Sequence, residues 1–278
     1  MLRAWRYARL GLHLLEGSLT LACVFPLVRP ATRLRLRQRW STHLLGVLGI
    51  DLRTGGQAVQ PGSLLVANHI SWVDIFVINA LAPTAFISKA EVRAWPLIGW
   101  LAARHETVFL RRGSRGHVRQ VNAEIAALLE AGRNVAVFPE GTTTDGSKVL
   151  GFHAALLQPA LSAGHPVQPV ALSYRGPDGS FSRAPAYDGD ISLGACLAAI
   201  VAERGLVAHA QPSAPIPAGA QADRRSVAQA AREIILRLTL DLEPQAETWK
   251  TSPSSTRSAV SLPPQTQPES SAISPGAR

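Results

Sequence analysis

Short apolar runs alternate with segments of helical periodicity from residue 51 onward, and this alternation constrains the fold more than any other feature of the chain. The clearest helical segment, 116–131, places apolar side chains at roughly 3.6-residue spacing and closes on Gly132, a residue that commonly ends helices. Strands that alternate with helices are typical of an α/β domain. The sequence therefore predicts an α/β fold built around one central sheet.

The expected elements follow from periodicity and from the turn residues between the apolar runs. We expect strands at 64–67, 85–88, 107–110, 134–138, 167–173 and 206–210. We expect helices at 72–82, 96–103, 116–131, 153–162, 193–203 and 223–242.

The amino-terminal segment differs from the rest in charge and hydropathy. Residues 10–28 form an apolar stretch of about membrane-spanning length that contains His13 and Glu16, with Pro26 near its end. Residues 1–50 hold eight arginines and only one acidic residue. We expect a membrane-embedded or interfacial helix that forms a hairpin with residues 34–50 and is anchored at lipid headgroups by arginine. A single membrane span and an ordinary core helix are the alternatives.

Composition supports a membrane surface as the partner. The chain is 46% hydrophobic and 17% charged, and its net charge of +9 comes mostly from the first 50 residues. The sequence contains no zinc-finger, RNP or helix-turn-helix pattern, so we expect no nucleic-acid partner. Cys23 and Cys196 lie in apolar contexts and cannot form a disulfide framework, which favours a reduced, cytosolic-side location.

Three regions follow from these patterns: a membrane-associated helical arm at 1–50, an α/β domain at 51–243 and a tail at 244–278. The tail is rich in Pro, Ser, Thr and Gln, with few large apolar residues. Such a segment buries too little apolar surface to offset its ordering entropy, so we expect it to be disordered.

One strand end carries a histidine followed five residues later by an aspartate, His69 and Asp74. Inside a continuous helix, residues five apart point about 140° away from each other. The two side chains can meet only if His69 precedes the helix and Asp74 lies on its first turn. Asp74 would then accept the proton of one ring nitrogen and leave the other as a base. Taken alone, the spacing also fits a strand-end histidine beside a helix-capping aspartate.

Two other strands also end in polar groups. The strand at 107–110 is followed by Arg111 and Arg112, and the strand at 134–138 by Pro139-Glu140-Gly141-Thr142. The carboxyl ends of parallel strands meet at one edge of a sheet, so these loops predict one pocket. Arginine, glycine and a small hydroxyl suit a phosphate or another anion, although arginines at 111–119 also fit a solvated face.

The sequence gives little support for a nucleotide-binding P-loop, a serine nucleophile or a metal site. Residues 141–148 have the glycine spacing of a phosphate-binding P-loop, but Ser147 and Lys148 stand in inverted order. No Gly-x-Ser-x-Gly elbow occurs, so we expect His69 to activate a hydroxyl of the substrate. We find no metal-ligand spacing, and we expect neither a metal nor a cofactor.

Four ordered blocks resemble those of the lysophospholipid acyltransferase family, which includes the 1-acylglycerol-3-phosphate acyltransferases. They are Asn68-His69-x4-Asp74, Phe109-Leu110-Arg111-Arg112, Phe138-Pro139-Glu140-Gly141-Thr142 and Gln168-Pro169-Val170. The resemblance implies a mixed, mostly parallel central sheet flanked by helices, with an amino-terminal membrane-associated helical segment. It also implies that His69 is the general base and Asp74 its orienting partner. The implied substrate-binding residues are Asn68, Arg112, Glu140, Gly141 and Thr142, with Arg112 contacting a phosphate.

Two departures bear on the acceptor lipid. Arg111 stands where the second block usually has an acidic residue, and the third block continues as Thr143-Thr144-Asp145-Gly146, which resembles the lyso-ornithine lipid acyltransferases. We therefore expect a membrane-bound O-acyltransferase that moves an acyl group from acyl-CoA or acyl carrier protein to a lysolipid hydroxyl. The first candidate acceptor is 1-acyl-sn-glycerol-3-phosphate and the second is lyso-ornithine lipid; a non-catalytic lipid-binding protein is the alternative of another class. The expected location is the cytoplasmic face of a bacterial-type inner membrane.

Overall fold

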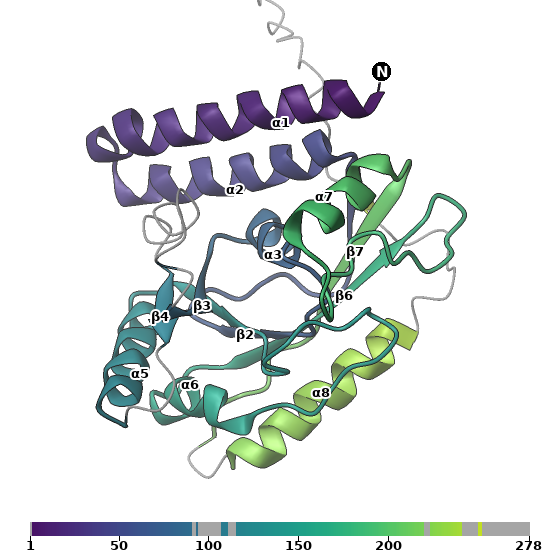
Figure 1. The fold of residues 1–278 in the computed structure, drawn as a ribbon. Helices are drawn as coiled ribbons and strands as arrows, with labels where there is room; N and C mark the ends of the chain where they lie inside the picture. Colours follow the sequence, from purple (N-terminus) through teal and green to yellow (C-terminus); the bar gives the residue numbers. More distant parts are fainter. Residues whose placement is uncertain are drawn as a thin grey trace, which may run out of the picture.

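A mixed sheet with helices on both faces follows a pair of amino-terminal helices (Figure 1). The computed structural model describes residues 2–90, 93, 107–110, 115–219, 223–240 and 250–251. Within these residues the sheet has eight strands, in the order β4-β3-β5-β2-β6-β7-β1-β8. Their bounds are β1 Ile50–Thr54, β2 Leu64–Ala67, β3 Thr84–Lys89, β4 Val108–Leu110, β5 Asn134–Val137, β6 Val167–Arg175, β7 Leu206–Pro212 and β8 Lys250–Thr251.

Most neighbouring strands are parallel. The five strands from β4 to β6 all run in the same direction. β7 is antiparallel to β6, β1 is parallel to β7, and β8 is antiparallel to β1. The expected mixed, mostly parallel sheet is confirmed, and the carboxyl ends of β2 and β5 lie at the same edge.

Two helical layers bury the two faces of the sheet. On one face lie α2 (Pro30–Leu48), α3 (Asp74–Leu81) and α7 (Leu193–Ala202), and on the other lie α5 (Arg115–Glu130), α6 (Gln158–Ser162) and α8 (Arg224–Leu240). Alternate residues of β6 serve the two layers: Leu172 and Tyr174 join the first core, and Ala171 the second. This division is the period-2 pattern of a strand buried on both faces.

Several expected elements differ in extent from the observed ones. The expected helix at 153–162 is a 3₁₀ turn, Ala154–Leu157, followed by α6, and Pro159 stands at the start of α6, where its missing N–H costs nothing. β1 was not expected, because Asp51 and Arg53 interrupt its apolar residues. The expected helix at 96–103 lies outside the described residues. Of the tail at 244–278, the structure describes only β8, which pairs with β1.

The amino-terminal helices form the expected hairpin. α1 (Leu2–Leu19) continues through a π-helical turn at Thr20–Val24 and a 3₁₀ turn at Phe25–Leu27, and α2 returns antiparallel beneath it (Figure 1). Among the described helices, the segment Arg3–Leu27 is long and apolar enough to cross a membrane, a property that core helices and signal sequences share. Cys23 is exposed and Cys196 is buried, and neither forms a disulfide.

Two sets of contacts fix the hairpin to the α/β domain. Arg6 Nη1 donates to the carbonyl oxygens of Val201 (2.9 Å) and Glu203 (2.7 Å) at the end of α7. Gln38 Nε2 donates to the carbonyl oxygens of Ala80 (3.0 Å) and Leu81 (3.1 Å) at the end of α3. These bonds satisfy carbonyls that lack partners within their own helices. The hairpin therefore rests on α3, the helix that begins at Asp74.

Candidate active site

The loops after β2 and β5 lie together because the two strands are adjacent and parallel. Val66 pairs with Val137, so Asn68-His69 and Phe138-Pro139-Glu140 leave the sheet side by side. On the other side of β2, Ala67 pairs with Val170 of β6. The sheet thus brings the first and third sequence blocks to one edge. The fourth block lies within β6, where Gln168 accepts the N–H of Gln60 and donates to the carbonyl oxygen of Ala58, both before β2.

His69 and Asp74 are in direct contact. The distance from His69 Nδ1 to Asp74 Oδ2 is 2.9 Å, and α3 begins at Asp74, as the five-residue spacing required. The Asp74 side chain is completely buried, whereas the His69 side chain is 20% exposed. The imidazole therefore contacts a buried carboxylate on one side and is partly open to solvent on the other.

The other contacts of Asp74 indicate the tautomer of the imidazole. Asp74 Oδ2 also accepts the backbone N–H groups of Ile70 (2.7 Å) and Ser71 (2.9 Å). A carboxylate oxygen that already accepts two N–H groups acts as an acceptor toward the ring as well, so Nδ1 carries the proton. The lone pair then lies on Nε2, for which the described residues provide no hydrogen-bond partner.

Tyr174 is a part of the site that the sequence blocks did not indicate. Its hydroxyl donates to Asp74 Oδ1 at 2.6 Å, and its side chain is fully buried at the end of β6. Burial, together with the nearby Asp74 carboxylate, raises the pKa of Tyr174 well above its ordinary value, so the phenol remains a donor. The available signal was the alternation along β6, which places Tyr174 on the same face as Val170 and Leu172.

Glu140 supports the backbone of His69. Its Oε1 accepts the N–H of His69 and its Oε2 accepts the N–H of Leu150, both at 2.8 Å, and the residue is only 4% exposed. Burial raises the pKa of Glu140, and the two N–H donors act in the opposite direction. With both oxygens engaged inside the protein, the geometry favours a positioning role for Glu140 over the direct substrate contact expected from the sequence.

Asn68 is also engaged internally. Its Nδ2 donates to the carbonyl oxygen of Leu172 at 2.9 Å, and its Oδ1 accepts the N–H of Leu172 at 2.8 Å. The residue is buried and continues the β2–β6 pairing by one step beyond the strand. Its position favours the same role, holding the loop that carries His69.

The loop after Glu140 folds over the backbone of His69. Thr144 N–H donates to the carbonyl oxygen of His69 at 2.9 Å, and Thr143 Oγ1 donates to the carbonyl oxygen of Tyr187. Gly141 has φ +73°, and a Cβ there would lie 3.2 Å from His153 Cδ2, so both backbone and space favour glycine. Thr142 is exposed at the turn of this loop.

The imidazole plane is held by Phe138. The two rings stack at 3.9 Å between centroids with an interplanar angle of 11°. Arg111 and Arg112, the remaining expected cationic groups, lie outside the described residues.

These groups define a class of chemistry. An imidazole is held by a buried carboxylate at a sheet edge, and among the described residues no serine hydroxyl or cysteine thiol is bonded to it. Such a site can assist attack by a hydroxyl of the substrate or by water. The class is that of direct transferases and hydrolases that use a histidine base.

Comparison with known proteins identifies the family. The acyltransferase family model matches residues 52–173, which include His69, Asp74 and Glu140. The chain is 46% identical over 204 residues to a lyso-ornithine lipid O-acyltransferase of Pseudomonas aeruginosa, covering 73% of this chain and 78% of that protein. It is 38% identical over 179 residues to a 1-acyl-sn-glycerol-3-phosphate acyltransferase of Neisseria meningitidis serogroup B, covering 64% and 70%.

A solved structure has the same fold. The crystal structure of the 1-acyl-sn-glycerophosphate (LPA) acyltransferase from Thermotoga maritima superposes with a TM-score of 0.65 over 88% of this chain and 95% of that chain, at 23% identity. The chain belongs to the lysophospholipid acyltransferase family, and it is an acyltransferase that acts on lysolipids. The family expected from the four sequence blocks is confirmed.

Proposed function

We propose that this enzyme transfers a fatty acyl group from a thioester donor, acyl-CoA or acyl carrier protein, directly to the free hydroxyl of a lysolipid, with His69 as the general base. The observation that carries the proposal is the 2.9 Å contact between His69 Nδ1 and Asp74 Oδ2. It orients the imidazole and leaves Nε2 as the basic nitrogen.

The reaction proceeds without an acyl-enzyme. His69 Nε2 takes the proton of the lysolipid hydroxyl while that oxygen attacks the thioester carbonyl carbon. The tetrahedral intermediate collapses by breaking the carbon–sulfur bond, and the thiolate receives the proton from the imidazolium. Asp74 stabilises the transient positive charge on His69 without itself being protonated.

The oxyanion of the intermediate requires N–H donors, and the local hydrogen bonds restrict the choice. The N–H groups of Ile70 and Ser71, which follow His69, are both donated to Asp74. The N–H of Gly141 is donated to Phe138. Those of Thr142 and Thr143 have no acceptor among the described residues, and we assign them to the oxyanion, a contribution of about 3 kcal/mol per donor in other enzymes.

We propose lyso-ornithine lipid as the first acceptor to test, ahead of 1-acyl-sn-glycerol-3-phosphate, which reverses the order expected from the sequence. The similarity to the lyso-ornithine lipid O-acyltransferase of Pseudomonas aeruginosa is higher and covers more of the chain. The sequence Thr143-Thr144-Asp145-Gly146 supports the same choice, because it resembles the third block of the lyso-ornithine lipid acyltransferases. Lysophosphatidate remains the second candidate on the strength of the Neisseria relative.

Membrane binding by the hairpin completes the proposal. Leu12, Leu15 and Leu19 are each more than half exposed on α1, on a segment rich in arginine. Apolar side chains beside cationic ones suit the interface of an anionic membrane. Because both substrates are amphiphiles, we propose that the enzyme works at a bacterial inner membrane, and its two free cysteines favour the cytoplasmic face.

A thiol-release assay tests the reaction. Protein in mixed micelles is given a long-chain acyl-CoA or acyl carrier protein, with lyso-ornithine lipid, lysophosphatidate or no acceptor. We expect release that depends on the acceptor, together with the diacylated product by mass spectrometry. His69→Ala should lower the rate by at least about 10³-fold and Asp74→Asn by at least about 10²-fold.

The control is His165→Ala, which removes a partly exposed histidine outside the site and should retain full activity. Release without an acceptor would indicate a hydrolase, and lipid binding without release would indicate a binding protein. Substantial activity in His69→Ala would reject the assignment of the base.

A further inference from the structure

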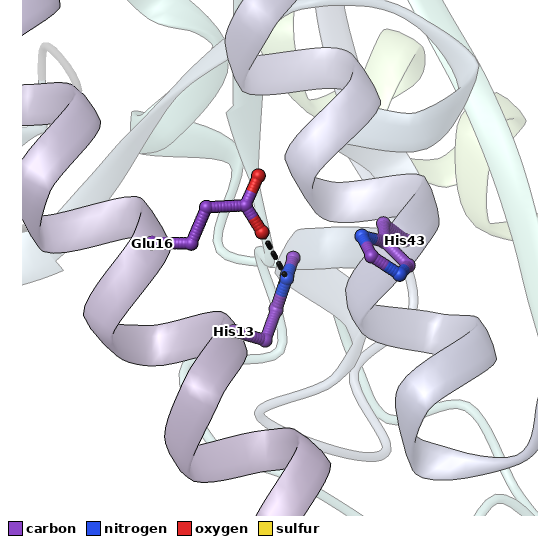
Figure 2. A group of neighbouring side chains, drawn as sticks. All are labelled: His13, Glu16 and His43. Atoms are coloured by element: carbon purple, nitrogen blue, oxygen red, sulfur yellow. Dashed lines mark ion pairs between the residues drawn. The ribbon is translucent and has the colours of Figure 1, made fainter.

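Three side chains with metal-binding atoms converge between α1 and α2: His13, Glu16 and His43 (Figure 2). His13 and Glu16 lie about one turn apart on the same face of α1. His43 reaches them from α2, thirty residues along the chain. One donor atom from each side chain lies within 4.8 Å of the other two. Because the hairpin alone brings them together, no short sequence spacing reveals the group.

His13 is held rigidly before any ligand binds. It is 3% exposed and stacks on Trp40 with ring centroids 4.6 Å apart and an interplanar angle of 12°. Its Nε2 lies 3.1 Å from the carbonyl oxygen of Trp40, and Trp40 Nε1 donates to the carbonyl oxygen of His13 at 3.2 Å. The close approach depends on Gly17, where a Cβ would lie 2.5 Å from Trp40 Nε1.

These contacts determine which ring nitrogen of His13 is basic. A carbonyl oxygen only accepts hydrogen bonds, so Nε2 carries the proton and Nδ1 carries the lone pair. Nδ1 is buried and has no hydrogen-bond partner among the described residues, and Glu16 Oε2 lies 3.5 Å from it. Two acceptors thus face each other. A metal-binding histidine commonly has this arrangement, with its other nitrogen donating to a backbone carbonyl.

We propose that His13 Nδ1, Glu16 and His43 bind one divalent transition-metal ion of the zinc class, which clamps α1 to α2. In a tetrahedral site with metal–ligand bonds of about 2.0–2.1 Å, neighbouring ligand atoms lie about 3.4 Å apart. The separation of His13 Nδ1 and Glu16 Oε2 is already 3.5 Å. Glu16 and His43 are exposed, so rotation of their side chains can close the remaining distances.

The donor set favours zinc over calcium or magnesium. Two imidazoles and one carboxylate suit Zn²⁺, whereas Ca²⁺ and Mg²⁺ prefer oxygen ligands alone. Glu16 is also the only acidic residue among the first 50, on a helix with large exposed apolar side chains. A bound dication would neutralise this carboxylate where a free charge is costly near lipid.

Zinc binding to the full-length chain tests the site. The chain must carry no polyhistidine tag, is kept in detergent micelles, and is stripped with a chelator. Titration with Zn²⁺ against a chromophoric chelator should show about one tight site per chain. Glu16→Gln and His43→Ala should each lower the affinity at least about 10-fold, and His165→Ala, outside the hairpin, should leave it unchanged.

A thermal readout separates binding from misfolding. In chelator, both variants should unfold at the temperature of the unsubstituted chain, because both side chains are exposed. Added Zn²⁺ should raise that temperature for the unsubstituted chain and for His165→Ala, but not for the two variants. The site would be overturned if the unsubstituted chain and all three variants bound Zn²⁺ with equal affinity, or if the unsubstituted chain bound none. His13 and Glu16 would then form an ion pair only.

Discussion

At the scale of single residues, the site is organised around the carboxylate of Asp74. Oδ2 accepts hydrogen bonds from the His69 ring and from the backbone N–H groups of Ile70 and Ser71. Oδ1 accepts the hydroxyl of Tyr174. The ring that performs the proposed proton transfer is therefore oriented by a group that is itself fixed from both the α3 turn and β6. Two predictions test this arrangement.

Tyr174→Phe removes only the hydroxyl on Asp74. Because the phenol positions the carboxylate without facing substrate, we expect kcat to fall about 10-fold while the KM for the acceptor stays unchanged. Loss of one hydrogen bond to a buried charge should also lower the free energy of unfolding by about 1–3 kcal/mol.

Steady-state kinetics and denaturant unfolding measure these effects. Tyr7→Phe, on the exposed surface of α1, is the matched control. A changed acceptor KM with constant kcat would show instead that Tyr174 contributes to substrate binding.

Glu140→Gln keeps the shape of the side chain but changes its hydrogen bonding. A carboxylate accepts both the His69 and the Leu150 N–H groups, whereas an amide can accept one and presents its own NH₂ to the other. A buried donor without an acceptor costs about 1–3 kcal/mol, and here it displaces the backbone of the base. We expect kcat/KM to fall about 10- to 100-fold, together with a lower melting temperature.

The matched control for this substitution is Glu130→Gln on the exposed end of α5, which should behave like the unsubstituted enzyme. Full activity in Glu140→Gln would mean that this carboxylate does not position His69.

At the scale of elements, the change of strand direction between β6 and β7 creates an environment that no sequence block describes. His209 of β7 pairs with Arg53 of β1 and with Ser173 of β6, and Arg175 lies on the same strand as Ser173. Burial first, and then the charges of Arg53 and Arg175, lower the pKa of His209 to about 4. This environment of His209 makes the free energy of unfolding depend on pH.

Because the folded-state pKa of His209 lies below the ordinary value near 6.5, acid favours the unfolded chain. Between these two values the unfolded state binds a proton that the folded state does not. This contribution to stability is present above about pH 6.5 and is lost as the pH falls toward 4. We expect the free energy of unfolding to fall by about 2 kcal/mol between pH 7 and pH 5 from this group.

Denaturant unfolding at the two pH values measures the effect. His209→Gln should remove most of the pH-dependent loss, whereas His165→Gln should preserve it. The same loss in both variants would place the acid sensitivity elsewhere in the molecule.

At the scale of the whole molecule, the hairpin that carries the proposed membrane-binding surface is bonded to the α/β domain at the ends of α3 and α7. α2 packs on α3, with Trp40 and Phe76 in edge-to-face contact at 5.8 Å. Phe76 also contacts Trp72, two residues before Asp74. These ring contacts connect α2 to the turn that leads into Asp74.

Replacing Leu12, Leu15 and Leu19 by serine should weaken membrane binding. These side chains are 68%, 56% and 54% exposed, so the fold does not depend on their burial. Each leucine buried in lipid contributes about 1.5 kcal/mol or more, so the partition coefficient into anionic vesicles should fall by at least about 100-fold. Vesicle co-sedimentation measures it.

Activity on substrates in detergent should remain close to that of the unsubstituted enzyme, which provides the control for folding. Raised salt should weaken binding of the unsubstituted chain to anionic vesicles because the arginine-rich hairpin also contributes charge attraction. Unchanged vesicle binding in the triple variant would assign the membrane contact to another surface.

The sequence by itself determined the α/β class and most strand positions, and it indicated the His69–Asp74 contact. These depend on local patterns: periodicity within one element, and a five-residue spacing that only a strand–turn–helix geometry satisfies. Tertiary structure decided the rest. Tyr174 reaches Asp74 from 100 residues away because β6 lies next to β2, and His43 reaches His13 because α2 folds back on α1. Such contacts depend on strand order and helix packing, which are set by burial across the whole chain and leave no local pattern.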